Sequence, residues 1–118
     1  ALLQGNIFNL NVAHTDSTRA IGLMGRTSLS DDEAMLFVYE DAEYRNFWMK
    51  DTLIPLDILF LDDHGIVVDV QTMDTQIGVI DRELKIYSSS KPARFALEMK
   101  AGLADNLEIT EGVFVLFR

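Results

Sequence analysis

Alternation of apolar and polar residues along the chain predicts a protein built mainly from β-strands. In residues 93–101, Phe95, Leu97 and Met99 face one way, whereas Glu98 lies among the polar residues that face the other way. We therefore expect Glu98 to be solvated. Similar patterns, or short runs with strand propensity, predict further strands at residues 6–13, 35–39, 46–49, 56–61, 66–70 and 113–117.

Only one segment has clear signals for a longer helix, at about residues 16–24. Thr15 can accept hydrogen bonds from free N–H groups at the start of the helix, and Gly25 can end it in the left-handed conformation. On this helix Arg19 and Arg26 share a stripe. Their side chains could hold a carboxylate or phosphate, or could tie the helix to the neighbouring acidic loop.

We expect a single domain over residues 1–118, because the chain has no linker, repeat or low-complexity segment. The predicted fold class is mainly β (α+β): a compact antiparallel β-barrel or sandwich of about six to eight strands with one principal short helix. A second short helix or turn is expected at 103–107. Residues 71–91 are least predictable, with strands possible at 77–80 and 84–87.

Charge and composition disfavour several classes of function. The chain has 10 Lys and Arg against 19 Asp and Glu, a net charge of -9, which would repel nucleic acid and anionic lipid. No apolar run approaches the ~20 residues needed for a membrane span. With no Cys, and with His14 and His64 far apart, we expect neither a metal nor a cofactor.

The stretch from residue 47 to 57 is the most informative, because it places one Trp and three charges between apolar runs. Trp48, Lys50 and Thr52 share one face of the predicted strand. An exposed Trp beside charged groups is typical of sites that bind a sugar or another flat polar ligand. The alternative is a Trp packed at the edge of the core, with the Lys50 chain passing over it.

Asp57 follows Pro55 and lies just inside an apolar strand. A buried carboxylate needs a partner, so we predict that Asp57 pairs with an Arg or Lys, with Arg19 as the first choice. A catalytic interpretation would pair Asp57 with Glu98 or Asp51, as the two carboxylates of a hydrolase.

Five segments carry a resemblance to a known family: Arg19-Ala-Ile-Gly22-Leu23-Met24-Gly-Arg26, Met35-Leu36-Phe37, Phe47-Trp48-Met49-Lys50-Asp51-Thr52, Ile54-Pro55-Leu56-Asp57 and Leu97-Glu98. Over about residues 5 to 117 the chain resembles the family catalogued as domain of unknown function 192. The resemblance implies a small β-rich domain, found in bacteria and archaea and often exported behind a signal peptide. It implies no established activity.

The chain departs from the family pattern at three places. Ala34 stands where Gly is usual, Asp51 where Asn is common, and Glu111-Gly112-Val113 near a usual Gly-Asp pair. Asp51 adds a negative charge at the centre of the predicted site.

We therefore interpret the chain as a non-enzymatic, exported or periplasmic domain that binds a small polar ligand, such as a saccharide. We predict a pocket lined by Trp48 and at least two of Arg19, Lys50, Asp51 and Asp57. The alternatives are a hydrolase with a carboxylate pair and a protein-interaction module with an acidic face. The candidate ligand-binding residues are Arg19, Arg26, Trp48, Lys50, Asp51, Thr52, Asp57 and Glu98.

Overall fold

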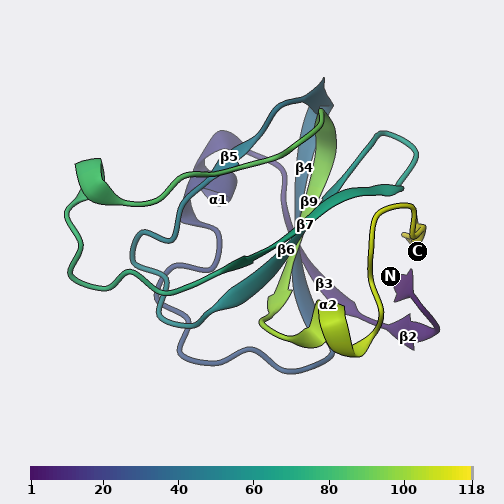
Figure 1. Ribbon diagram of the computed structural model, residues 1–118, viewed down its shortest axis with the longest axis horizontal. Helices are drawn as coiled ribbons and strands as arrows, with labels where there is room; N and C mark the ends of the chain where they lie inside the picture. Colours follow the sequence, from purple (N-terminus) through teal and green to yellow (C-terminus); the bar gives the residue numbers. More distant parts are fainter. Residues whose placement is uncertain (118) are drawn as a thin grey trace.

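A five-stranded sheet forms the centre of the protein, whose computed structural model describes residues 1–117 (Figure 1). In spatial order the sheet consists of β3 (Asn9–Ala13), β4 (Glu33–Glu43), β9 (Ala93–Lys100), β6 (Leu56–Leu61) and β7 (Val67–Met73). Neighbouring strands are antiparallel except β3 and β4, which run parallel. This departure from an all-antiparallel sheet is possible because the long connection through α1 returns the chain to the same end.

Two small sheets accompany the central one. β1 (Leu2–Leu3) lies between β10 (Val115–Leu116) and β2 (Asn6–Ile7), and β5 (Asn46–Phe47) pairs with β8 (Tyr87–Ser88). These strands have only two residues each, which is why the sequence pattern predicted fewer strands. The predicted mainly-β class is confirmed. The sheets do not close into a barrel, so the architecture is sandwich-like.

Helix α1 (Asp16–Ile21) begins where the sequence predicts and ends earlier. Thr15 is its N-cap: the Thr15 Oγ1 accepts from the Thr18 N–H at 3.1 Å, and the Thr15 N–H donates to the Thr18 Oγ1 at 3.0 Å. The helix ends because Gly22 takes a φ of +50°. A Cβ at Gly22 would lie 3.3 Å from a Phe37 ring carbon, so the turn after α1 packs closely on β4.

The predicted second helix is present as α2 (Leu103–Asn106). No helix in residues 1–117 is long and apolar enough to cross a membrane.

Two hydrophobic clusters cover the two faces of the central sheet. One includes Leu59, Leu97 and Met99 and extends to α2, whereas the other includes Ile58 and Phe60 and extends to the turn after α1. All six residues of β6 are buried, so this strand runs through the middle of the core.

This arrangement separates two buried carboxyl groups. Asp57 lies opposite Met99 in the strand register, and Glu98 lies opposite Ile58. Because consecutive side chains of a strand point to opposite faces, Asp57 faces the α2 side and Glu98 faces the α1 side.

Within residues 71–91, 71–73 end β7 and 87–88 form β8, and the irregular segment 74–86 between them projects from the body of the molecule as the green loop at the left of Figure 1. The strand suggested at 77–80 is absent, and the one suggested at 84–87 is replaced by β8. A 3₁₀ turn, η1 (Asp81–Glu83), precedes β8. Gly78 has a φ of +82°, which interrupts any extended run at this point.

Candidate functional site

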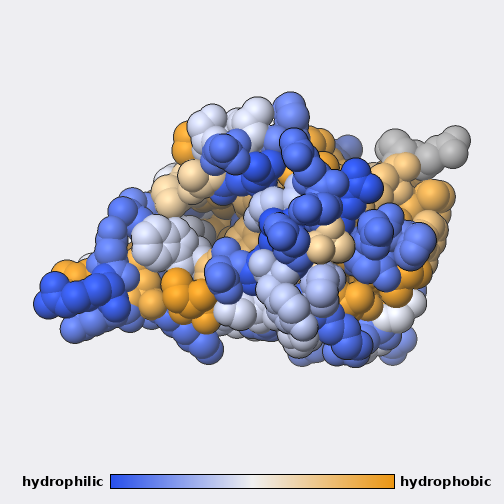
Figure 2. Space-filling model, turned by 90° about the horizontal axis from the view of Figure 1, so that it is seen from above, coloured by the Kyte–Doolittle hydropathy of each residue, from blue (hydrophilic) through white to orange (hydrophobic). Residues whose placement is uncertain are grey.

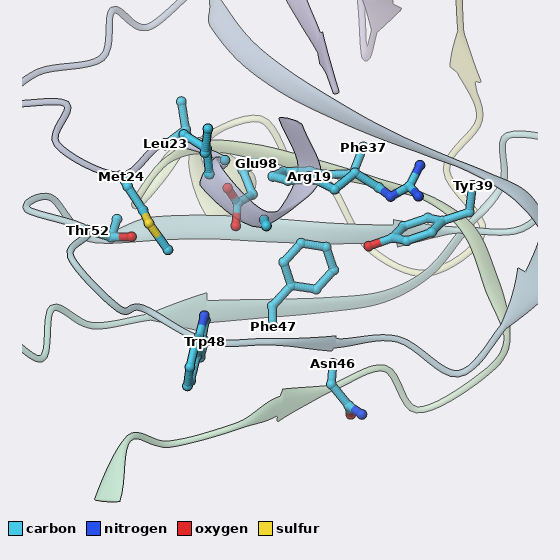
Figure 3. A pocket seen from close by; sticks show the side chains of 13 residues that line it. Arg19, Leu23, Met24, Phe37, Tyr39, Asn46, Phe47, Trp48, Thr52 and Glu98 are labelled. Carbon is cyan, nitrogen blue, oxygen red and sulfur yellow. The ribbon is translucent and has the colours of Figure 1, made fainter. Parts of the chain in front are cut away.

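A cavity of about 150 Å³ opens on the face of the central sheet that carries Glu98 (Figure 3). Its walls come from α1 and the following turn, from β4 and β9, and from the chain between residues 46 and 52. Its side chains are mostly apolar, with a few polar groups among them: Leu23, Met24, Phe37, Phe47 and Trp48, with Arg19, Tyr39, Asn46, Thr52 and Glu98.

The Glu98 carboxyl group is directed into this cavity, as Figure 3 shows. Glu98 is only 4% exposed. Among residues 1–117, no group donates a hydrogen bond to its carboxylate oxygens and no cation forms an ion pair with it. Burial raises the pKa of Glu98 to about 8, because the charged form is poorly solvated there. The group is therefore mostly protonated at neutral pH.

The prediction that Glu98 is solvated is wrong. β9 is a central strand between β4 and β6, and the α1 region and the chain between residues 46 and 52 cover the face of its middle part that carries Glu98. Other polar residues of this face lie nearer the strand ends: Lys100 is exposed and its Nζ lies 3.1 Å from Asp31, while the Arg94 Nε donates to the Tyr39 carbonyl oxygen at 3.3 Å. The alternation correctly predicted that Glu98 shares a face of the strand with Arg94 and Lys100. It did not predict that the α1 region covers this face.

Aromatic rings form much of the cavity wall. The Phe37 and Phe47 ring centroids lie 5.0 Å apart with their planes at 83°, and Phe47 also packs against Phe60 at 5.8 Å. Trp48 is 38% exposed at the edge of the cavity, with the Lys50 Nζ 5.5 Å from its ring centroid. The indole ring therefore lines the cavity and is not enclosed in the core.

Arg19 and Tyr39 close one end of the cavity. The Arg19 Nη1 donates to the carbonyl oxygens of His14 and Val38, each at 2.8 Å, and its Nη2 lies 2.7 Å from Asp16. The Arg19 Cζ is 4.8 Å from the Tyr39 ring centroid. The guanidinium is thus held at this end of the cavity, and burial raises the pKa of the Tyr39 hydroxyl.

Asp57 is buried, but its partners are not cations. It is 2% exposed, its Oδ1 accepts from the Thr72 hydroxyl at 2.7 Å, and its Oδ2 accepts from the Gly102 and Ala104 N–H groups at 2.9 Å each. Because the N–H groups at the start of α2 have no partner within the helix, they can serve the carboxylate. The prediction of an Arg or Lys partner, with Arg19 as first choice, is therefore wrong.

The carboxylate pairs predicted for a hydrolase do not form. The central sheet separates Asp57 from Glu98, and Asp51 lies in an exposed turn that does not line the cavity. Asp51 has a φ of +52°, a conformation in which Asn and Asp are the most common residues after Gly. The turn itself therefore accounts for the residue at position 51.

Two other predicted site residues pair with acidic side chains outside the cavity. The Lys50 Nζ lies 2.8 Å from the Asp81 Oδ2, and the Arg26 Nη2 lies 3.1 Å from the Glu33 Oε2. Arg26 thus ties the turn after α1 to the acidic segment, which is the structural role considered for it from the sequence.

The predicted pocket is present but with fewer charges than expected. Trp48 lines it with Arg19, whereas Lys50 and Asp51 line a separate hollow of about 80 Å³. The expectation of at least two charged partners from the four named is wrong. Thr52 does line the cavity: it is 5% exposed and its hydroxyl donates to the Lys50 carbonyl oxygen at 3.2 Å.

Several residues of the cavity were not predicted as site residues, Phe37, Tyr39 and Phe47 among them. Phe37 and Tyr39 lie two apart in β4, so the sequence does show that they share a face. The sequence could not show that this is the face on which Glu98 lies, because that depends on the pairing of β4 with β9.

No group of three or more His, Asp and Glu side chains within residues 1–117 is arranged to hold a metal ion. His14 precedes α1, and His64 lies in the predicted hairpin turn, where its N–H donates to the Asp62 carboxylate at 2.9 Å. Both side chains are exposed.

Comparison with known proteins identifies related sequences and structures. The model of the DUF192 family, described as "Uncharacterized ACR", matches residues 2–117. A protein of unknown function from Novosphingobium aromaticivorans DSM 12444 is 31% identical, with a TM-score of 0.81, over 95% of this chain and 76% of its own. A protein from Sinorhizobium meliloti 1021, proposed to be a transcription regulator, is 28% identical, with a TM-score of 0.80, over 91% of this chain and 79% of its own. No curated protein is significantly similar.

Proposed function

This chain belongs to the DUF192 family, and because that family is uncharacterised we propose a function from the geometry: the protein binds a small polar ligand in the cavity lined by Glu98. The observation that carries the proposal is the Glu98 carboxyl group, which is buried, directed into the cavity and without a partner in residues 1–117. Its oxygens face the open space of the cavity and are not sealed from it, so a ligand that enters can reach them. A strongly raised carboxyl pKa in a cleft is also typical of functional sites.

The composition of the cavity supports the same proposal. Four of the five segments that carry the family resemblance contribute to its wall: 19–26, 35–37, 47–52 and 97–98. These segments are far apart in the sequence and come together around the cavity. An apolar lining with a few converging polar groups is the usual form of a small-molecule site.

Binding has more support than hydrolysis. The hydrolase interpretation needs two carboxyl groups on either side of one bond. Of the carboxyl groups in residues 1–117, only that of Glu98 lines this cavity, and Asp57 is on the other face of the sheet, fully engaged with Thr72 and α2.

A role in binding DNA has little support. The description of the Sinorhizobium meliloti protein as a transcription regulator applies to that protein. For this chain, a net charge of -9 would repel the phosphate backbone and weaken association.

The fluorescence of Trp48 provides a direct test, because the chain has a single Trp and its ring lines the cavity. We would titrate the protein with small saccharides, carboxylic acids and amines. At least one compound should change the Trp48 emission in a saturable way. Ala20 also lines the cavity and is exposed, so Ala20→Leu should obstruct it without disturbing the core.

Ser17→Leu is the matched control, because Ser17 is exposed on the same helix and lies outside this cavity. It should leave the titration unchanged. If no compound gives a saturable change, or if both variants bind as the native protein does, the cavity is not the ligand site.

A second candidate function, a protein-interaction module, has support from the projecting segment 74–86. Ile77, Ile80 and Ile86 are 67%, 47% and 52% exposed. Figure 2 shows apolar residues beside hydrophilic ones at this left-hand end of the molecule. Single exposed apolar residues are ordinary, but several on one projecting segment favour a docking surface. Sedimentation with and without the Ile77→Ser substitution tests its simplest form, self-association, which the substitution should weaken.

A further inference from the structure

We propose that the ligand of this cavity is a small organic cation, whose ammonium group pairs with the Glu98 carboxylate and is enclosed by aromatic rings. The proposal rests on the ligand-binding function proposed above and adds the charge and size of the ligand.

Among residues 1–117, the cavity contains a carboxyl group but no free cation. Within this described part of the chain, Arg19 is the only Lys or Arg that lines the cavity, and its guanidinium is engaged by Asp16 and by two backbone carbonyl oxygens. Lys50 is held by Asp81 outside the cavity. An ionised carboxylate in a buried site needs an opposite charge. Since residues 1–117 do not provide one for Glu98, a cationic ligand is the group that would.

The walls are chemically matched to a cation. Trp48, Phe37 and Phe47 line the same cavity as Glu98, whereas the Tyr39 ring is already covered by the guanidinium groups of Arg19 and Arg45. The negative faces of aromatic rings attract ammonium groups, and rings at different inclinations, such as Phe37 and Phe47 at 83°, can surround one from several sides. A neutral sugar would gain stacking from these rings but would not supply the positive charge that the Glu98 carboxylate lacks among residues 1–117.

The wider electrostatic surroundings favour the same sign of charge. The last residues of α1 and the following turn form one wall, and the C-terminal end of a helix carries partial negative charge. The net charge of -9 also makes the approach of a cation more favourable than that of an anion.

The volume limits the size of the cation. About 150 Å³ is the share of roughly five water molecules in the liquid, so the cavity fits an ammonium headgroup with a few carbon atoms. Larger molecules would have to extend past Trp48 into solvent.

Binding should be linked to protonation of Glu98. The other charged or titratable side chains that line the cavity are Arg19 on α1 and Tyr39 on β4. With a pKa of about 8, Glu98 is ionised in roughly a tenth of the molecules at pH 7 and in most at pH 9. A cation that needs the carboxylate should therefore bind about tenfold more tightly at pH 9 than at pH 7 and release a proton.

The experiment compares tetramethylammonium with tert-butanol, a neutral molecule of similar size, and with acetate, using Trp48 fluorescence at pH 7 and pH 9. Tetramethylammonium should bind saturably and more tightly at pH 9, and Glu98→Gln should weaken it at least tenfold at pH 9. Glu83→Gln, at an exposed position outside the cavity, is the matched control and should bind like the native protein. Calorimetry of the native protein in two buffers of different ionisation enthalpy should detect proton release, which keeps the test independent of the variant's folding.

The outcomes separate this proposal from the one on which it rests. Saturable binding of tert-butanol or acetate that equals or exceeds that of tetramethylammonium would overturn the cation and leave ligand binding intact. Tetramethylammonium binding that is unchanged by pH and by Glu98→Gln would also overturn it. No saturable response to tetramethylammonium or to any amine, with a response to a saccharide or a carboxylic acid of the wider library, would do the same. No response to any compound would overturn both proposals.

Discussion

Replacing Glu98 with Gln should remove a pH dependence of stability that the burial of this residue creates. Burial raises the pKa of Glu98 from 4.5 to about 8. Between these values the folded protein keeps a proton that the unfolded chain releases, so the free energy of unfolding falls as the pH rises. The contribution is complete below pH 4.5 and is lost as the pH rises through about 8. Arg19 and Tyr39, which line the same cavity, are retained in the variant.

The size of the effect follows from the width of this window. Each pH unit corresponds to about 1.4 kcal/mol for one proton. Between pH 5 and pH 8 the free energy of unfolding of the native protein should therefore fall by about 3 to 4 kcal/mol relative to that of Glu98→Gln. This is a large part of the ~5–15 kcal/mol that stabilises a typical domain. The variant should consequently be the more stable protein at pH 8.

Urea denaturation from pH 5 to pH 8.5, followed by Trp48 fluorescence, measures this difference. Other titrating groups contribute equally to the free energy of unfolding of both proteins, so their contributions cancel when the two are compared at each pH. Glu83→Gln should follow the native protein throughout, because Glu83 is exposed. The native protein and Glu98→Gln differ in their free energy of unfolding, and this difference should change with pH. If it stays constant from pH 5 to pH 8.5 to within ~0.5 kcal/mol, near the error of the extrapolation, Glu98 does not have a raised pKa.

Three other substitutions test the roles of neighbouring groups. Asp57→Asn should lower the free energy of unfolding by about 2 to 4 kcal/mol, because the carboxylate accepts three hydrogen bonds in a buried site. Thr72→Val should lower it by only about 1 kcal/mol. Equal losses of the two variants in urea denaturation would contradict this ranking. Lys50→Ala should have the same free energy of unfolding and the same Trp48 ligand titration as the native protein, because the ion pair of Lys50 with Asp81 is exposed. Loss of the titration would show that Lys50 takes part in ligand binding. Thr15→Ala should cost about 1 kcal/mol through loss of the N-cap, and a thermal midpoint equal to that of the native protein would show that the cap is not needed.

Much of the fold could be predicted because local signals were strong. The apolar run 56–61 has the bounds of β6, and the alternation from residue 93 has nearly those of β9. Thr15 marked the start of α1 through its capping chemistry. The parallel pairing of β3 with β4 could not be predicted, because it depends on the path of the connecting chain rather than on the residues of either strand.

The site was harder to predict because coverage is a tertiary property. Trp48, Arg19 and Thr52, which were candidate residues from the sequence, line the cavity. Alternation showed which residues accompany Glu98 on its face of β9, but not that the α1 region covers that face. Likewise, the sequence showed that Asp57 needs partners, but backbone N–H groups have no signature in a residue pattern.

None of the side chains of α1 is buried, although the helix forms one wall of the cavity. Its loss would therefore leave both hydrophobic clusters covered by the remaining structure. Such a unit opens by local fluctuation, with a much smaller free energy than unfolding of the whole protein. Amide hydrogens of α1 should consequently exchange with solvent far faster than those of β6 and β9. A ligand that fills the cavity should slow amide exchange in α1 and leave exchange in the strands unchanged. Local opening of this helix would then be the step that lets a ligand enter and leave the site.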